Sequence, residues 1–388
     1  MGSIAQADAT DTHLNHAPNP EGAACKVEKE EAKPWDIGES IMHHIGNSNE
    51  FEIIPHVIIP LPCILYAPSN GFTVCLSNKF EEGTVAVDGF VLNEGRVMRV
   101  ADNTFPKGEV RLGEGAIHEA GKTDDGGFTV CYGGKLYKIE SGSTLFGATS
   151  FYDFSITKNV FTLLLAAILM FVIFLSMASA YKRRVGAAPK GLQNMLEVAI
   201  VFIRDEVAKP FIGHNYERYF PFILTIFFFI LINNFLGLIP IFPGGANVTG
   251  NIATTFVLAI ITFIYTNING KRDYWAHIFW MPGVPVIMKI FLAPIEIIGL
   301  FAKPASLMIR LFANITAGHI IVLSLVGLIF VFGNSGQNMV GSVAGVLLAV
   351  PFTLFIDIIE LVVAAIQAFI FATLAASYIG SAIEEHHH

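Results

Sequence analysis

Two apolar stretches in the C-terminal part decide the fold. The first is VPVIMKIFLAPIEIIGLFAKPASLMIRLFANITAGHIIVLSLVGLIFVF, residues 284–332, and the second is GSVAGVLLAVPFTLFIDIIELVVAAIQAFIFATLAASYIGSAI, residues 341–383. Each keeps an apolar helical pattern over more than 40 residues, and a helix of that length measures about 65 Å, roughly twice the hydrocarbon core of a bilayer. Only residues 333–338, GNSGQN, have the composition of a turn. We therefore expect two long, strongly tilted membrane helices that form one hairpin.

Ionisable side chains recur inside this hairpin, although an Arg at the centre of a membrane helix costs about 2.5–3.5 kcal/mol. Four of them are spaced by seven residues, which leaves a drift of only about 20° on a helix, so they follow one slowly turning face. Asn314 lies one turn beyond Arg310, the last of the four, whereas His319 lies about 180° round the helix from Arg310. The four are Lys289, Glu296, Lys303 and Arg310.

Residues at equal distances from the turn of an antiparallel hairpin face each other. By this rule Arg310 should neighbour Gln367, and His319 should neighbour Glu360 or Asp357, at a different depth. Arg310 has no acidic residue within four positions, which predicts a carboxylate partner on another subunit. An imidazole that faces carboxylates predicts a proton path, because His titrates near neutrality. The alternative is that these charges pair internally and only make the hairpin insertable.

Three shorter spans are expected before the hairpin. Lys and Arg residues follow the first of them at 182–184 and recur at 271–272. The positive-inside rule therefore places these positions and the C-terminus in the cytoplasm, and the N-terminal part outside. Residues 189–213 mix apolar and charged residues at helical spacing, which is typical of a helix on the cytoplasmic surface. The expected spans cover about 160–180, 219–242 and 252–268.

The charge of the chain is unevenly distributed. The 388 residues carry a formal net charge of −8, with 12 Lys and Arg against 22 Asp and Glu in residues 1–158 and 12 against 10 in the remainder. The acidic balance excludes a nucleic-acid partner. A content of 53% hydrophobic and 14% charged residues argues against a purely soluble protein, and the lipid bilayer is the expected partner.

The N-terminal part divides by composition into three segments. Residues 1–34 form a polar acidic tail without a visible signal peptide, so we expect the natural precursor to carry one. Residues 35–70 are amphipathic and then rich in proline, and 71–150 alternate β-like runs with Gly and Asp-Gly pairs. With a membrane domain over 151–388, the expected fold is an all-α polytopic membrane protein of about five membrane segments with a small β-rich extracytoplasmic domain.

All four cysteines precede the first span, and none has CxxC spacing, so no metal or cofactor is expected. In an oxidising compartment Cys75 and Cys131 are the preferred disulfide, because both lie in similar strand-like runs. Four free thiols are the alternative.

Several motifs resemble subunit a of the rotary F-type ATP synthase. They are MIRLFANITAGH (308–319), IQAFIF (366–371), the ending SAIEEH, ILINNFLGLIPIF (230–242), NVTGNIATT (247–255) and KPASL (303–307). The resemblance covers residues 150–388, and the β-rich N-terminal insertion is similar to that of the Bacteroidetes-type branch.

The resemblance implies a proton-translocating stator subunit of a bacterial inner membrane, with no active site of its own. Its partners are then a ring of c subunits, the b subunits of the peripheral stalk and the rest of the complex. Arg310 matches the Arg that separates two offset half-channels, with Asn314 and Gln367 as the polar residues beside it. His319 and Glu360 match the paired residues of the outer half-channel, in an order opposite to that of some members. Further matches are Glu296 near the inner half-channel and Asn234 on the second span. Gly237 stands where some members carry an Asp, and Asp357 is a candidate to replace it. His277 and Asp273 are candidates for proton exit, and the alternative is that they are simply residues of the membrane interface.

Two other classes of protein compete with this interpretation. A secondary ion transporter or channel could use the same buried charges, but such transporters commonly show repeated halves, and no internal repeat is visible. A membrane enzyme is disfavoured because the chain has no HExxH, GxSxG or phosphate-loop motif.

Overall fold

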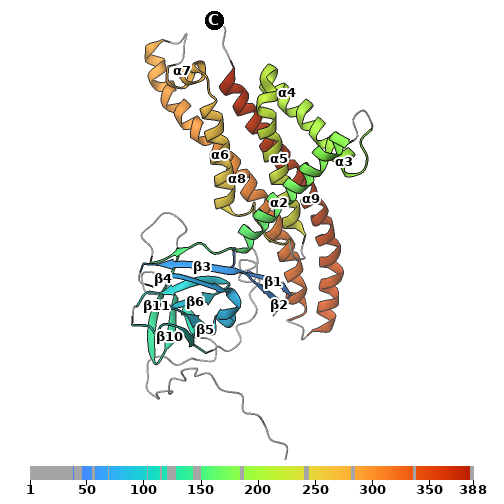
Figure 1. Ribbon diagram of the computed structural model, residues 1–388. Coiled ribbons are helices and arrows are strands. Elements are labelled where there is room, and N and C mark those ends of the chain that lie inside the picture. The colour runs from blue at the N-terminus through green and yellow to red at the C-terminus, as the bar shows by residue number, and fades with distance from the viewer. Residues whose placement is uncertain are drawn as a thin grey trace, which may run out of the picture. The chain divides into compact units, whose positions relative to one another are not determined.

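The computed structural model describes residues 38, 46–54, 57–68, 70–102, 104–113, 116–119, 128–142, 150–183, 188–239, 244–280, 285–334 and 338–384. The chain divides into a β-rich unit, which includes Ser48–Thr157, and a helical unit from Lys158 onward (Figure 1). This confirms the expected fold class of a helical membrane protein with a β-rich N-terminal region. The predicted acidic tail of residues 1–34 lies outside the described residues.

The β-rich unit begins earlier than residue 71, where its start was predicted. Three strands, β1 (Glu50–Ile54), β2 (Val57–Pro60) and β3 (Pro62–Ala67), lie in the proline-rich segment. Proline disfavours a regular helix but is tolerated at strand ends, where Pro60 and Pro62 lie. The further strands are β4 (Gly71–Leu76), β5 (Val85–Val87), β6 (Phe90–Asn93), β7 (Arg96–Val100), β8 (Glu109–Arg111), β9 (Ile117–Glu119), β10 (Phe128–Tyr132), β11 (Lys135–Ser141) and β12 (Tyr152–Asp153).

All strand pairs in the described residues are antiparallel, and two tight turns follow the expected Gly chemistry. Asp88-Gly89 joins β5 to β6 and Glu94-Gly95 joins β6 to β7, and all four residues have positive φ, as a type I′ hairpin turn requires. The strands form a two-stranded sheet β1-β2, a seven-stranded sheet β8-β5-β6-β7-β11-β10-β9 and a three-stranded sheet β12-β3-β4.

The inner face of the three-stranded sheet contributes two of the four cysteines to a core. Cys63 on β3 and Cys75 on β4 are directly opposite each other in the register, and both are buried free thiols. The predicted Cys75–Cys131 disulfide is therefore wrong. Cys131 is in a disulfide, but it lies on β10 of the seven-stranded sheet. The similar runs around Cys75 and Cys131 therefore reflect a shared strand pattern and do not indicate that the two cysteines pair.

Within its described residues, the helical unit contains four helical stretches that are long and apolar enough to cross a membrane, or five if the bent pair α6–α7 counts as one span. The predicted surface segment 189–213 contains α3, a π-helical turn at Ile203–Ala208 and α4. The helices are α2 (Lys158–Arg183), α3 (Leu192–Phe202), α4 (Lys209–Ile212), α5 (Tyr216–Leu238), α6 (Ile252–Ile268), α7 (Arg272–Trp280), α8 (Val286–Phe332) and α9 (Met339–Ile383).

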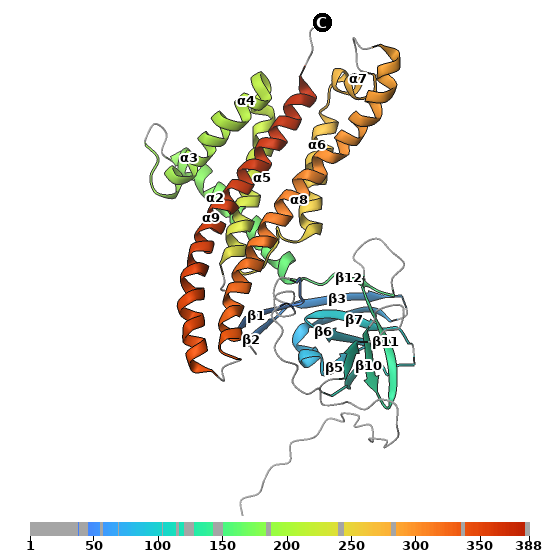
Figure 2. The ribbon, with the colours of Figure 1, turned by 180° about the vertical axis from the view of Figure 1, so that it is seen from behind.

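The hairpin of two long helices is confirmed. α8 has 47 residues and α9 has 45, and the two run side by side in both views of the ribbon (Figures 1 and 2). Each stays continuous through its prolines, Pro294 and Pro304 in α8 and Pro351 in α9. Proline is tolerated in membrane helices because neighbouring groups satisfy the backbone carbonyls that it frees.

Small residues allow α9 to pack closely against its neighbours. Its buried face is largely alanine from residue 364 to 382, and it packs against α5 and α4. Helices in lipid associate through such close contacts because lipid supplies no hydrophobic drive between them. A close approach to α4 is at Gly380, where an added Cβ would overlap the carbonyl group of Phe211.

We predict that Gly380→Ala lowers the stability of the full chain in detergent by about 1–3 kcal/mol, because backbone atoms of α4 must move to admit a methyl group. The measurement is the midpoint of thermal unfolding. Gly299→Ala on α8 is the matched control, because a Cβ there meets nothing within 4 Å and Ala favours helix. Equal midpoints for the two variants would contradict the close approach.

Candidate functional site

A buried carboxyl group faces a histidine across the hairpin. Nδ1 of His319 on α8 lies 2.7 Å from Oε1 of Glu360 on α9, in hydrogen-bond contact. Glu360 is only 5% exposed, and its side chain lies in the apolar part of a membrane helix. A buried carboxylate without a partner costs several kcal/mol, so the imidazole is what makes this position tolerable. The predicted pairing of His319 with Glu360 is thereby confirmed.

A glycine next to the histidine makes room for this contact. A Cβ on Gly318 would lie 2.7 Å from Oε1 of Glu360 and 2.9 Å from its Cδ, closer than packed atoms allow. Gly318 therefore lets the carboxyl group lie against the backbone of α8. The sequence shows this glycine within the ITAGH run, but its spacing alone gives no sign that it serves a residue 42 positions away.

The segment between α5 and α6 holds both halves of the pair in place. Asn234 on α5 donates a hydrogen bond to the carbonyl oxygen of Ala364, one turn beyond Glu360, at 3.0 Å. The hydroxyl group of Thr249 in turn donates to Oδ1 of Asn234 at 2.7 Å. The side chain of Asn234 is thus occupied at both ends and fixes α9 beside the buried carboxyl group.

The same segment also contacts α8. The hydroxyl group of Thr316, one turn before His319, donates to the carbonyl oxygen of Gly250 at 3.3 Å. Residues 246–250 are buried, and the side chain of Asn247 accepts a hydrogen bond from the backbone N–H of Gly250. One buried loop therefore connects to both helices of the hairpin within a turn of His319 and Glu360.

Arg310 has a different environment from the pair. It lies on α8 nine residues before His319, about 14 Å along the helix, and its side chain is exposed. Within the described part of the chain, no carboxylate lies within ion-pair distance of it. Neighbouring Ile309 is 55% exposed, so Arg310 lies on a part of the α8 surface that the described residues leave open. Such a surface calls for an occupant that brings a negative charge.

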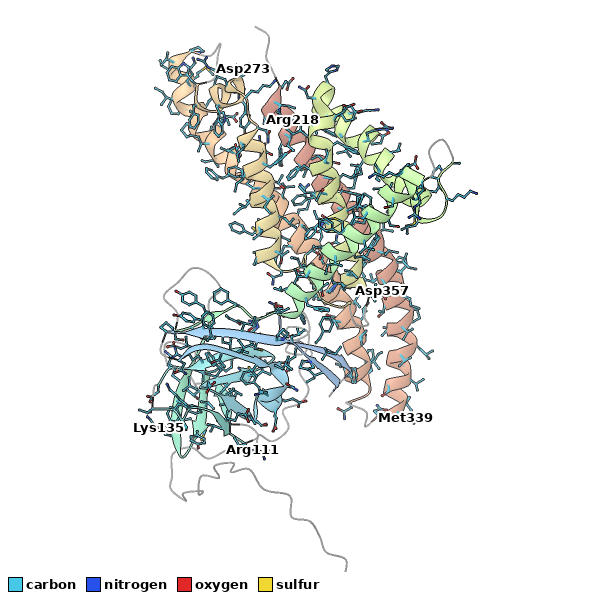
Figure 3. All side chains as sticks on the ribbon, viewed as in Figure 1. Arg111, Lys135, Arg218, Asp273, Met339 and Asp357 are labelled. Atoms are coloured by element: carbon cyan, nitrogen blue, oxygen red, sulfur yellow. The ribbon has the colours of Figure 1, made fainter. Side chains whose placement is uncertain are left out.

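The other predicted residues are distributed along the hairpin. Gln367 is buried on α9, Asn314 is exposed on α8 and Glu296 is half-buried further along α8. The predicted contact between Arg310 and Gln367 stays a prediction. Figure 3 shows Asp357 on α9 between Met339, where the helix begins, and the opposite end of the helical unit, where Arg218 and Asp273 lie.

A small cavity lies between α6, α7, α8 and α9 on the side of Arg310 away from the His319–Glu360 pair. The ammonium group of Lys303 lies 5.5 Å from the ring centre of Tyr378 in its wall. Lys289 packs in the same way on Trp280, at 4.7 Å, as expected of a lysine near a helix end. The polar residues that line the cavity are Thr262, Thr266, Asn267, Tyr274, Lys303 and Tyr378. The described residues contain no cluster of side chains suited to a metal ion.

Comparison with known proteins gives two family matches. Residues 160–380 match a family described as ATP synthase A chain, and residues 40–125 match one described as a domain of unknown function. The first match spans more than half of the chain and includes the hairpin and the buried loop. The chain belongs to the ATP synthase subunit a family. Family membership favours this function over the transporter or channel considered from the sequence.

Individual relatives agree with the family match. ATP synthase subunit a of Chloroherpeton thalassium is 44% identical over 259 residues, which cover 65% of this chain and 72% of the relative. ATP synthase subunit a 2 of Chlorobaculum tepidum is 44% identical over 237 residues, 60% of this chain and 64% of the relative. ATP synthase subunit a of Myxococcus xanthus is 40% identical over 243 residues, which cover 61% of this chain and 75% of the relative. As a subunit a, the chain is a multi-pass membrane protein of the F-type ATP synthase and takes part in proton transport and ATP synthesis.

We predict that Gly318→Ala impairs proton transport, because the added methyl group displaces the carboxyl group of Glu360 from His319. The measurement is ATP-driven acidification of membrane vesicles that contain the assembled complex. Gly299→Ala on the same helix is the control and should pump normally. Adding Glu360→Asp to the Gly318 variant should restore part of the rate, because the shorter side chain withdraws from the methyl group. Normal pumping by Gly318→Ala alone would contradict the prediction that proton transport needs the Glu360–His319 contact for which Gly318 leaves room.

Proposed function

We propose that this chain provides two offset proton half-channels to a rotating ring of c subunits, with Arg310 as the residue that separates them. The observation that carries this proposal is an exposed arginine without an ionic partner in the described chain, on the outward face of a membrane hairpin. A ring that presents ionised carboxylates would supply the missing charge. The peripheral stalk with its b subunits would hold the chain against the ring's rotation.

Arginine suits the separating role for two physical reasons. Its pKa exceeds about 12, so it stays charged and does not pass its own proton onward. Each proton that crosses 100 mV releases about 2.3 kcal/mol, which a continuous aqueous pore would dissipate. A fixed cation between two half-channels forces each proton to travel on a ring carboxylate instead.

The pair His319–Glu360 supports an outer half-channel. From His319, α8 continues for 13 residues, about 20 Å, to the hairpin turn. Positive charges gather at the other end of the helical unit, where α2 ends at Lys182 and Arg183 and where α7 begins at Arg272. By the positive-inside rule that end faces the cytoplasm of a bacterial inner membrane, as does the C-terminus, while the β-rich unit and the hairpin turn face outward.

The cavity beside Lys303 supports an inner half-channel. It lies toward the positively charged end of the unit, and its wall combines hydroxyl, amide and ammonium groups with an apolar remainder. Glu296 lies on α8 seven residues, or about 10 Å, from Lys303 and can carry protons toward the cytoplasm. His277 and Asp273 on α7 lie at the same end of the unit and complete this proposed exit.

We predict that Arg310→Gln abolishes ATP synthesis that is driven by a proton gradient, because no charge then holds the ring carboxylate or blocks direct proton flow. The measurement is ATP formation by vesicles with the assembled complex under an imposed gradient. Lys289→Gln on the same helix is the matched control, since Lys289 already rests on Trp280, and it should keep most of the rate. Synthesis at the normal rate in the Arg310 variant would contradict the proposal.

A second prediction concerns the order of acid and imidazole in the outer half-channel. His319→Glu alone and Glu360→His alone should each slow proton pumping strongly, because each leaves two like groups facing each other. The double exchange restores one acid and one imidazole and should recover a several-fold higher rate than either single variant. The check is the initial rate of ATP-driven acidification. A double variant no faster than the singles would show that the pair does not act as a unit.

A further inference from the structure

One face of the three-stranded sheet β12-β3-β4 is apolar and aromatic. Side chains alternate along each strand, so that one set enters the core with Cys63 and Leu65 and the other points outward. Six of the outward residues form what we call the aromatic face, and none of them carries a charge. They are Tyr66, Phe72, Val74, Leu76, Tyr152 and Phe154.

The aromatic face is exposed and continuous. Phe72 is 71% exposed, Val74 is 69% exposed and Phe154 is 51% exposed. The ring of Tyr66 contacts those of Phe72 and Tyr152, at 4.7 and 6.4 Å between centres, and Tyr152 contacts Phe154 at 6.5 Å. A row of four aromatic rings, two exposed and two half-buried, in the strongly acidic N-terminal part of the chain marks an interaction surface.

A very short segment of chain links this sheet to the first membrane helix. Pairing with β3 continues past β12, because the backbone N–H groups of Phe154 and Ile156 donate to the carbonyl oxygens of Ile64 and Pro62. α2 begins at Lys158, so only Thr157 separates the last of these hydrogen bonds from the helix. One residue spans at most about 3.6 Å. Chain connectivity alone therefore keeps the β3–β12 edge of the sheet within a few ångströms of the first residue of α2, the first candidate membrane span.

We propose that the aromatic face rests on phospholipid, at the boundary between headgroups and acyl chains of the leaflet where α2 begins. Tyrosine suits this depth because its ring is apolar while its hydroxyl group reaches polar headgroups or water. The fully apolar side chains, Phe72 and Val74 among them, reach toward the acyl chains. The β-rich unit is then a membrane-bound platform, a role independent of Arg310 and of the proposed half-channels.

The test uses the assembled complex in vesicles of phosphatidylethanolamine and phosphatidylglycerol. The photoreactive amino acid p-benzoylphenylalanine replaces Phe72 in one variant and Val74 in a second, both exposed enough to leave the fold intact. Leu136 on β11 of the other sheet is the matched control, because it is also apolar and 50% exposed. After irradiation, mass spectrometry identifies what each probe has joined, and ATP hydrolysis by the complex confirms assembly.

Lipid adducts at positions 72 and 74, in several-fold higher yield than at 136, are the expected result. Crosslinks from 72 and 74 to a protein subunit would overturn the proposal and identify a protein as the occupant. Equal lipid yields at all three positions, or no adduct at 72 and 74, would overturn it as well. Because the readout is the crosslinked product, it does not depend on how Arg310 or the His319–Glu360 pair performs.

Discussion

The helical unit depends on how it accommodates one carboxyl group inside a membrane hairpin. Glu360 is buried between helices, where an unpaired charge would be costly, and His319 lies 2.7 Å away on the facing helix. The contact fixes the register of α8 against α9, because a shift of one residue rotates each side chain by about 100° and separates the two groups. Gly318 permits the approach by leaving room for the carboxyl oxygen.

The surrounding structure reinforces that register from outside the hairpin. The buried loop before α6 connects to Ala364 through Thr249 and Asn234, and to Thr316 through the carbonyl group of Gly250. These bonds reach α8 and α9 within one turn of the acid–imidazole pair. The alanine face of α9 then brings α5 and α4 close enough to hold the hairpin as a rigid element. If the pair carries protons as proposed, its placement requires this kind of support, since misplacement by even one ångström lengthens the transfer distance.

The sequence predicted those features that follow from helical periodicity and counting. The long apolar pattern and the single turn at 333–338 predicted the hairpin, and equal spacing from that turn predicted the pairing of His319 with Glu360. Contacts between distant segments left no such pattern: the bond from Asn234 to Ala364 joins residues 130 positions apart. Local similarity also misled, because the runs around Cys75 and Cys131 share a strand pattern while lying in different sheets. The proline-rich composition of 35–70 did not predict strands, yet β2 ends at Pro60 and β3 begins at Pro62.

Glu360 and Arg310 have opposite environments in the hairpin. The contrast indicates which of the two groups is partnered within the chain and which is available to another subunit. Glu360 is buried and in hydrogen-bond contact with His319, so its carboxyl group has a partner within the chain before any other subunit arrives. Arg310 is exposed on the same hairpin about 14 Å away, where water or a charged partner must balance it. A carboxylate fixed beside Arg310 would neutralise its charge permanently, but it would not allow the partner to move past. Under the proposed function, a succession of ring carboxylates that arrive, pair and leave balances the same charge while allowing rotation, so an exposed arginine suits a stator better than an internally paired one.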